Sequence, residues 1–264
     1  NTIHMRAGLA KLRFLMEQPS LSGRAYNFLS LVSQLGKDIA MNTGPMPTAP
    51  DKRLGFLDPS TKLKGVTNKF TYLIHNFWHC KNAKPMMDAD RKFPLYPKKG
   101  RDNIPDDKDL FCVSVVNLRG KNGSSGYTLD ILVSQSEGML LGLTEFHYIK
   151  EYKDQKINRF GISGNLQNYV LDLYPECSLS RTTIRGKIDD DAKLRRALNI
   201  TAELCQMHEH WQHLHDTDPG LLCSPKELYD DLKAKGYDWD YLLTHTRGWW
   251  CPDNDDKRHS LRFL

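Results

Sequence analysis

The sequence lacks several patterns that would decide its class at once. No apolar run reaches the length of a membrane-spanning helix, so we expect no membrane association. The segment NTIHMRAGLAKLRFLMEQ has no continuous apolar core and no small-residue cleavage site, which argues against a signal peptide. Neither a glycine-rich loop followed by GK[ST] nor a G-x-S-x-G element is present, which leaves P-loop NTPases and serine hydrolases without support.

Cysteine is used sparingly, with six residues in 264 and no C-x-x-C pair. This usage is not typical of a disulfide framework, so we predict that the cysteines are mostly reduced and buried and that the protein is cytoplasmic. The net charge of +5 permits a partner with phosphate groups without requiring one. Hydrophobic residues make up 39% of the chain, which is enough for a core of ordinary size.

Changes in composition along the chain predict two parts. Residues 1–41 carry apolar residues at helical spacing, including a stripe that ends at Leu35, and predict helices that either dock a protein partner or pack as an appendage. Residues 42–60 contain four prolines, each of which removes a backbone donor, and predict a linker. The expected domains are therefore a helical appendage with its linker, 1–60, and a larger domain, 61–264.

The larger part begins with strands and ends with helices. An apolar helix is predicted over 68–80, before three β-rich stretches at 110–118, 126–134 and 138–149, which are separated by turns that contain glycine and serine. From about Leu166 onward, helical spacing dominates. We therefore predict the α+β class, with an antiparallel β meander followed by a mainly helical half and an N-terminal helical appendage.

The segment CQMHEHWQHLHD, residues 205–216, brings four histidines, a cysteine and a glutamate into one predicted helix. Zinc requires three or four ligands at about 2.0–2.3 Å, and one helix face supplies two easily. The spacing also differs from the H-E-x-x-H pattern of zinc proteases. A metal site remains one interpretation and a solvated histidine-rich helix the favoured one, and we expect no cofactor.

Basic residues form two groups in the sequence. Phe77, Trp78, Phe93 and Tyr96 are interleaved with the first, and this combination suits an RNA backbone with unstacked bases. The alternative interpretation, a solvated loop and a solvated helix face, has equal weight. The groups are Lys81, Lys84, Arg91, Lys92, Lys98, Lys99 and Arg101, and then Arg181, Arg185, Lys187, Lys193, Arg195 and Arg196.

Several segments, taken in order, resemble the ribosome-inactivating proteins, which are rRNA N-glycosylases, and most closely the cereal type. FTYLIHNFWHC is similar to their early helix, FPLYP to the segment after it, and LFCVSVVNLRGKNGSSGYTLDILVSQSEGMLLGL to their central hairpin. ISGNLQNYVLDL followed by RTTIRGKIDDDAKLRRAL is similar to the stretch that precedes their catalytic helix. The resemblance covers roughly residues 61–245 and lies in pattern and order.

The resemblance implies a set of site residues. In CQMHEHWQHL, Glu209 stands for the family's catalytic glutamate and Gln212 for its arginine, and Trp239 in YDWDYLL stands for its pocket tryptophan. Tyr169 matches the second of two tyrosines that sandwich the target adenine, and Met139 replaces the first. The connection before the catalytic helix is shorter than in the family, so the resemblance leaves open whether Glu209 or another glutamate matches the catalytic one.

N-glycoside cleavage explains why such residues would be needed. Positive charge develops on the ribose, where a carboxylate stabilises it, and negative charge develops on the leaving adenine, where an arginine does so. Gln212 supplies no cation and Met139 stacks poorly on a base. The resemblance therefore implies an attenuated rRNA N-glycosylase that inhibits translation, a toxin-like or defence activity, with ribosomal RNA or the ribosome as partner. The alternative is a catalytically inactive binding or scaffold module of the same fold.

Overall fold

A computed structural model of the chain describes residues 35–37, 61–63, 74–88, 93–98, 108–120, 125–152, 160–165, 168–214 and 223–245, with isolated positions between 10 and 32. The chain divides into two compact units, residues 1–81 with 114–129 and residues 82–113 with 130–264. The predicted linker, 42–60, lies outside the described residues, so the predicted domain boundary stays a prediction.

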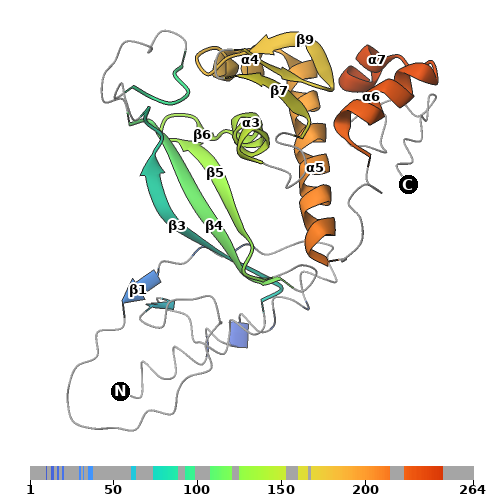
Figure 1. Ribbon diagram of the computed structural model, residues 1–264. Coiled ribbons are helices and arrows are strands. Elements are labelled where there is room, and N and C mark those ends of the chain that lie inside the picture. The colour runs from blue at the N-terminus through green and yellow to red at the C-terminus, as the bar shows by residue number, and fades with distance from the viewer. Residues whose placement is uncertain are drawn as a thin grey trace. The chain divides into compact units, whose positions relative to one another are not determined.

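Four strands form the larger sheet and follow one another in space as they do in the chain (Figure 1). They are β3 (Asn76–Pro85), β4 (Leu110–Gly120), β5 (Thr128–Ser134) and β6 (Gly138–Met139). Strands β5 and β6 pair antiparallel, with Val133 opposite Met139. The predicted meander is confirmed, and together with the helices described below it confirms the α+β class.

Two predicted helical segments contain strands instead. Residues 76–80 of the predicted helix 68–80 lie in β3, where half-buried and exposed side chains alternate with the period of a strand. Leu35, the end of the predicted N-terminal stripe, lies in β1 (Leu35–Lys37), which pairs antiparallel with β2 (Thr61–Leu63). In both places the apolar spacing fits the period of a helix as well as that of a strand, and pairing with a neighbouring strand selects the strand.

Helix α3 (Leu141–Glu151) takes the place of the third predicted β-rich stretch, which is wrong beyond Met139. Its buried residues Leu143, Phe146 and Ile149 are three apart and share one face of the helix. The hydroxyl of Thr144 accepts a hydrogen bond from the backbone N–H of Leu132 at 3.0 Å, which joins the helix to β5.

A second sheet consists of β7 (Ile162–Asn165), β8 (Asn168–Leu171) and β9 (Tyr174–Leu179), all antiparallel. Strands β8 and β9 lie within the region predicted to be mainly helical from about Leu166 onward, so that prediction is wrong before residue 180. Residues 169 and 171 of β8 are buried and their neighbours less so, which is the alternation of a strand with one covered face.

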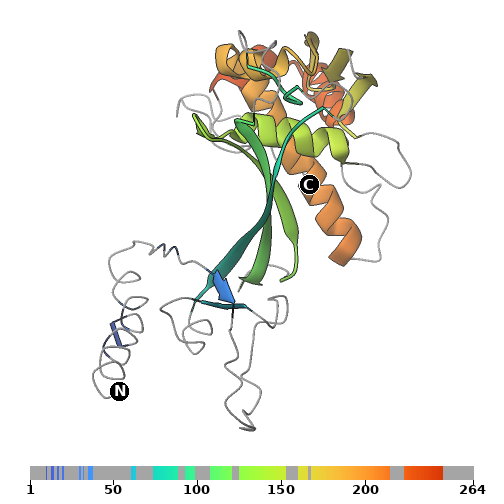
Figure 2. The same ribbon diagram turned by 90° about the vertical axis from the view of Figure 1, so that its left-hand side faces the viewer.

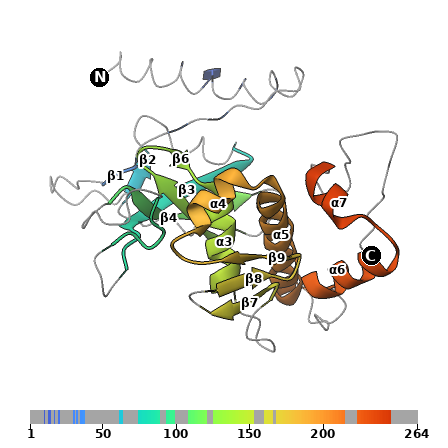
Figure 3. The same ribbon diagram turned by 90° about the horizontal axis from the view of Figure 1, so that it is seen from above.

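Helices α4 (Ile184–Asp190) and α5 (Ala192–Leu214) follow, as predicted. Figures 1 and 2 show α5 as the longest helix, crossing α3. Its apolar face, from Leu194 to Cys205, joins α3 and the β7–β9 sheet in one core. Helix α6 (Pro225–Ala234) begins with a capping box between Ser224 and Glu227, and α7 (Trp239–His245) follows it. Figure 3 shows both on the side of α5 away from α3.

Five cysteines lie among the described residues, and all five are free thiols, as predicted. Of these five described cysteines only Cys205 is buried, so the prediction that most are buried is wrong for them. None of the helices in the described part of the chain combines the length and apolar composition that crossing a bilayer requires.

Candidate functional site

Glu209, the carboxylate implied by the resemblance, lies on α5 beside α3. The hydroxyl of Tyr148 donates to Glu209 Oε2 at 2.7 Å, and the glutamate is partly buried. This hydrogen bond joins the side chain of Glu209 to α3. Glu209 therefore belongs to the contact between the two helices.

The neighbouring His208 is a core residue. It is 4% exposed, its ring stacks on Phe160 with centroids 4.8 Å apart, and its Nδ1 lies 2.7 Å from the hydroxyl of Tyr152. Where side chains are described, no group of three His, Cys, Asp or Glu is arranged to hold a metal ion. The side chains of His210, His213 and the whole of His215 lie outside the described part of the chain.

The two predicted aromatic pocket residues lie in the core. Tyr169 is 4% exposed, and its ring meets Phe146 edge-on at 5.8 Å. Trp239 is 8% exposed, and its indole N–H donates to the carbonyl of Leu173 at 2.6 Å. Tyr229 contacts Trp239 edge-on as well. Both rings already have packing neighbours, so a purine would have to displace some of these to stack on either one.

The remaining predicted residues differ in setting. Met139 is 56% exposed at the end of β6. The backbone of Gln212 is helical, and its side chain lies outside the described part.

Glu209 contacts α3 through Tyr148, and Tyr169 contacts α3 through Phe146. Residues 146 and 148 are two apart in the sequence and therefore about 200° apart around the helix. Glu209 and Tyr169 therefore meet different sides of α3.

A second polar group on α5 combines two carboxylates with an arginine. Arg196, 8% exposed, donates to the side-chain oxygen of Asn199 at 2.6 Å, and the amide nitrogen of Asn199 donates to Glu145 of α3 at 3.1 Å. Glu203 also interacts with Arg196 and Asn199. We call these four residues the α3–α5 polar cluster.

The pKa values in the α3–α5 polar cluster are shifted toward neutral side chains. Burial raises the pKa of Glu145, and the nearby Glu203 raises it further, against the opposing effects of Asn199 and Arg196. Burial likewise raises the pKa of Glu203, and it lowers the pKa of Arg196 despite both carboxylates. Shifted acids beside a cation are typical of sites that move protons.

Sequence reasoning missed the α3–α5 polar cluster, although part of its signal was present. Arg196, Asn199 and Glu203 follow one another at three and four residues, the spacing that places side chains on one face of a helix. Glu145 could not have been found in this way, because it lies 54 residues from Asn199 and in a stretch predicted as β-rich.

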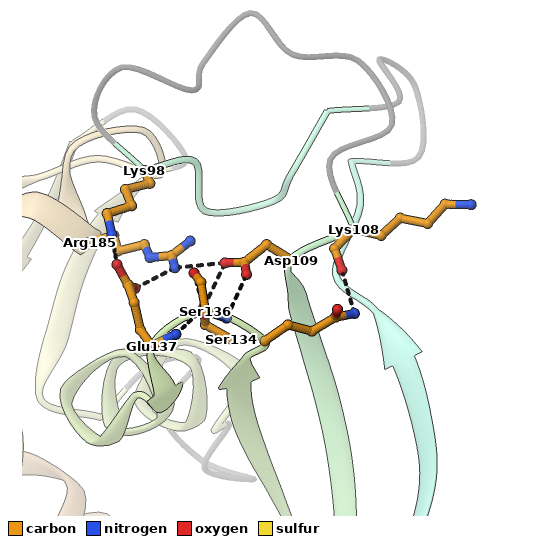
Figure 4. A network of polar contacts seen from close by, with 8 residues as sticks. Lys98, Lys108, Asp109, Ser134, Ser136, Glu137 and Arg185 are labelled. Carbon is orange, nitrogen blue, oxygen red and sulfur yellow. Dashed lines mark hydrogen bonds and ion pairs between the residues drawn. The ribbon is translucent and has the colours of Figure 1, made fainter.

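A third polar group lies at the open end of the β4–β5 hairpin, where β4 begins and β5 ends, and joins this end to α4 (Figure 4). Arg185, 5% exposed, donates to Asp109 Oδ2 at 3.2 Å and to Glu137 Oε2 at 2.6 Å. Ser134 donates to Asp109 Oδ2 at 2.7 Å, the backbone N–H of Ser136 donates to its Oδ1, and Lys98 pairs with Glu137. We call this group the hairpin network.

Most residues of the second basic group make hydrogen bonds or ion pairs with other residues of the protein. Arg181 donates to the carbonyls of Pro94 and Leu95, Lys187 donates to the carbonyl of Ser178, and Lys193 pairs with Asp240. Arg185 and Arg196 belong to the two polar groups described above. For these residues the interpretation as an RNA-binding helix face loses most of its basis.

No protein-family model matches the chain, and no curated protein matches it. The likeness to ribosome-inactivating proteins therefore stays a resemblance carried by the segments quoted above.

Proposed function

We propose that the domain is an attenuated rRNA N-glycosylase that removes an adenine from a loop of ribosomal RNA. The observation that supports the reaction best is the α3–α5 polar cluster, where carboxylates with raised pKa values lie beside a buried arginine. N-glycoside cleavage needs an anion at the ribose and a cationic or acidic group at the leaving base. Gln212 cannot supply a cation, whereas Arg196 can.

Two glutamates of α5 are therefore candidates for the carboxylate at the ribose. Glu209 follows from the resemblance and is held by Tyr148. Glu203 lies six residues earlier, about 9 Å along the helix, and has Arg196 as its neighbour. The two assignments predict different mutants to be inactive, so one experiment distinguishes them.

The test measures adenine released from purified ribosomes by the full chain. Removing the carboxylate charge should lower release by about 10²–10³-fold, so either Glu209→Gln or Glu203→Gln becomes inactive while the other stays near wild type. Glu176→Gln, an exposed glutamate on β9, is the matched control and should keep full activity. Equal activity of all three variants would exclude both assignments.

The inactive binding module is the second candidate, and the packing of Tyr169 and Trp239 favours it. Both rings are enclosed by core neighbours, which leaves little aromatic surface for a base. This alternative predicts that the wild type releases no adenine but still sediments with ribosomes. Release by the wild type would reject it.

A further inference from the structure

Asn199 contacts all three other members of the α3–α5 polar cluster. Its side-chain oxygen accepts a hydrogen bond from Arg196 at 2.6 Å, and its side-chain nitrogen donates one to Glu145 at 3.1 Å. A hydrogen bond also joins Asn199 to Glu203, which lies one turn further along α5. One uncharged side chain therefore connects a cation with two acids that come from two helices.

The chemistry of these neighbours favours a single orientation of the Asn199 amide. A guanidinium only donates hydrogen bonds, so the amide oxygen must face Arg196. The amide nitrogen carries two hydrogens, which is one for each carboxyl group. Turning the amide over would place donors against donors at Arg196 and acceptors against acceptors at the acids, so the three contacts together hold the side chain.

The members of the cluster differ in their access to water. Arg196 is 8% exposed, whereas the other three side chains are half-buried. The two acids can therefore exchange protons with water or a ligand, while the cation beside them stays enclosed. This division suits a site in which carboxyl groups change their charge and an arginine does not.

The ionisation of the two acids depends on Asn199 as well as on charge. Burial raises the pKa of Glu145 and that of Glu203, and the hydrogen bonds from Asn199 oppose this effect in both. The charged groups that face one another here are Glu145 on α3 and Arg196 and Glu203 on α5. Arg196 favours the ionised form of both acids, and Glu203 disfavours that of Glu145.

We propose that Asn199 is the positioning residue of the α3–α5 polar cluster, which holds both carboxyl groups beside Arg196 and sets the pH range in which they ionise. Its role in the reaction rests on the proposed function, because the cluster must then be the site of adenine removal. Its effect on ionisation is a property of the folded chain and can be measured without any substrate.

The test follows the side-chain carboxyl signals of Glu145 and Glu203 in the full chain by NMR as the pH is raised, with Glu145→Gln and Glu203→Gln to assign them. Asn199→Asp loses both donors and adds a third acid, so both titration midpoints should move to higher pH. Asn199→Gln keeps the amide on a longer stem and should stay near the wild type. The matched control for the added charge is Asn168→Asp, at an exposed position of β8, and it should move neither midpoint.

Adenine release from ribosomes gives the second readout. For Asn199→Asp, the rise of kcat with pH should move to higher pH, because the carboxylate at the ribose must be ionised. At neutral pH kcat should fall about tenfold, the effect of roughly one hydrogen bond, while KM changes little. Asn199→Gln should restore most of the activity.

Two titration results would overturn the proposal. The first is a pair of midpoints that move no further in Asn199→Asp than in Asn168→Asp, and the second is an equal movement in Asn199→Asp and Asn199→Gln. An active wild type whose kcat and pH profile are unchanged by Asn199→Asp would remove the role of Asn199 in the reaction. A wild type that releases no adenine would reject the proposed function itself, and the titration would still decide whether Asn199 sets the ionisation of the acids.

Discussion

Asp109 and Glu145 are carboxylates of the same compact unit, each close to an arginine, yet their pKa values move in opposite directions. Burial alone would raise the pKa of Asp109, but hydrogen bonds from Ser134, Arg185 and Ser136 together hold it well below its usual range. Glu145 receives the amide of Asn199 and faces a second carboxylate, Glu203, so burial prevails and its pKa rises.

The number of donors explains the difference between the two environments. A carboxylate with several donors keeps its charge and acts as a fixed part of the structure. A carboxylate with few donors and an acidic neighbour takes up a proton more easily and can exchange it with a ligand. The hairpin network is therefore a structural element, and the α3–α5 polar cluster is the better candidate for chemistry.

The largest expected effect comes from removing the arginine of the hairpin network. Arg185→Met leaves Asp109 and Glu137 without their shared cation, and we expect the free energy of unfolding to fall by about 3–5 kcal/mol. Urea denaturation at pH 7 measures this change. The control Arg195→Met removes an exposed arginine of α5 and should alter stability by about 0.5 kcal/mol or less. A loss below about 1 kcal/mol for Arg185→Met would show that the network contributes little.

A smaller effect is expected for Asp109→Asn, and it depends on pH. Because the folded-state pKa of Asp109 lies below its usual value, its stabilisation is present above about pH 4 and is lost as the pH falls toward the folded-state pKa. The variant should be about 2 kcal/mol less stable at pH 7, and the gap should narrow below pH 4. Urea denaturation across this range tests the prediction.

The exposed Asp189 of α4 provides the control for that series. Asp189→Asn should give a small difference from the wild type at every pH. A gap for Asp109→Asn that stays constant down to pH 2 would mean that the carboxylate charge contributes nothing to the network.

The sequence was sufficient for the fold wherever local pattern and tertiary packing agree. Strands β4 and β5 and the helical region that contains α5 and α6 were predicted because their apolar spacing and the turns between them indicate the same structure. Residues 76–80 and 141–149 were assigned to the wrong class because a short apolar run fits both periods. Pairing with β4 makes residues 76–80 a strand, and burial of Phe146 against Tyr169 favours a helix at residues 141–149.

The candidate site was less predictable, because its contacts join distant parts of the chain. A glutamate on α5 could be expected from the sequence, but its partner Tyr148 lies 61 residues away. The exposure of Met139 and the enclosure of Trp239 depend on packing that no spacing encodes. Whether Glu209, Tyr169 and Trp239 act together stays a prediction.

The smallest expected effect has the opposite sign to that of Asp109 and tests the comparison directly. Because the folded-state pKa of Glu145 lies above its usual value, ionising it costs more in the folded protein, and the wild type loses stability as the pH rises from 4 toward that pKa. Glu145→Gln keeps an oxygen to accept from Asn199 but does not titrate. The stability of this variant relative to the wild type should therefore increase by on the order of 1 kcal/mol between pH 4 and 6.

Urea denaturation at closely spaced pH values measures that difference, with Glu176→Gln as the exposed control. A relative stability that stays flat for Glu145→Gln would mean that donors outside the cluster balance its burial. A relative stability that falls as the pH rises would make Glu145 a stabilising anion like Asp109. The two carboxylate environments would then be alike, and the α3–α5 polar cluster would lose its claim to proton chemistry.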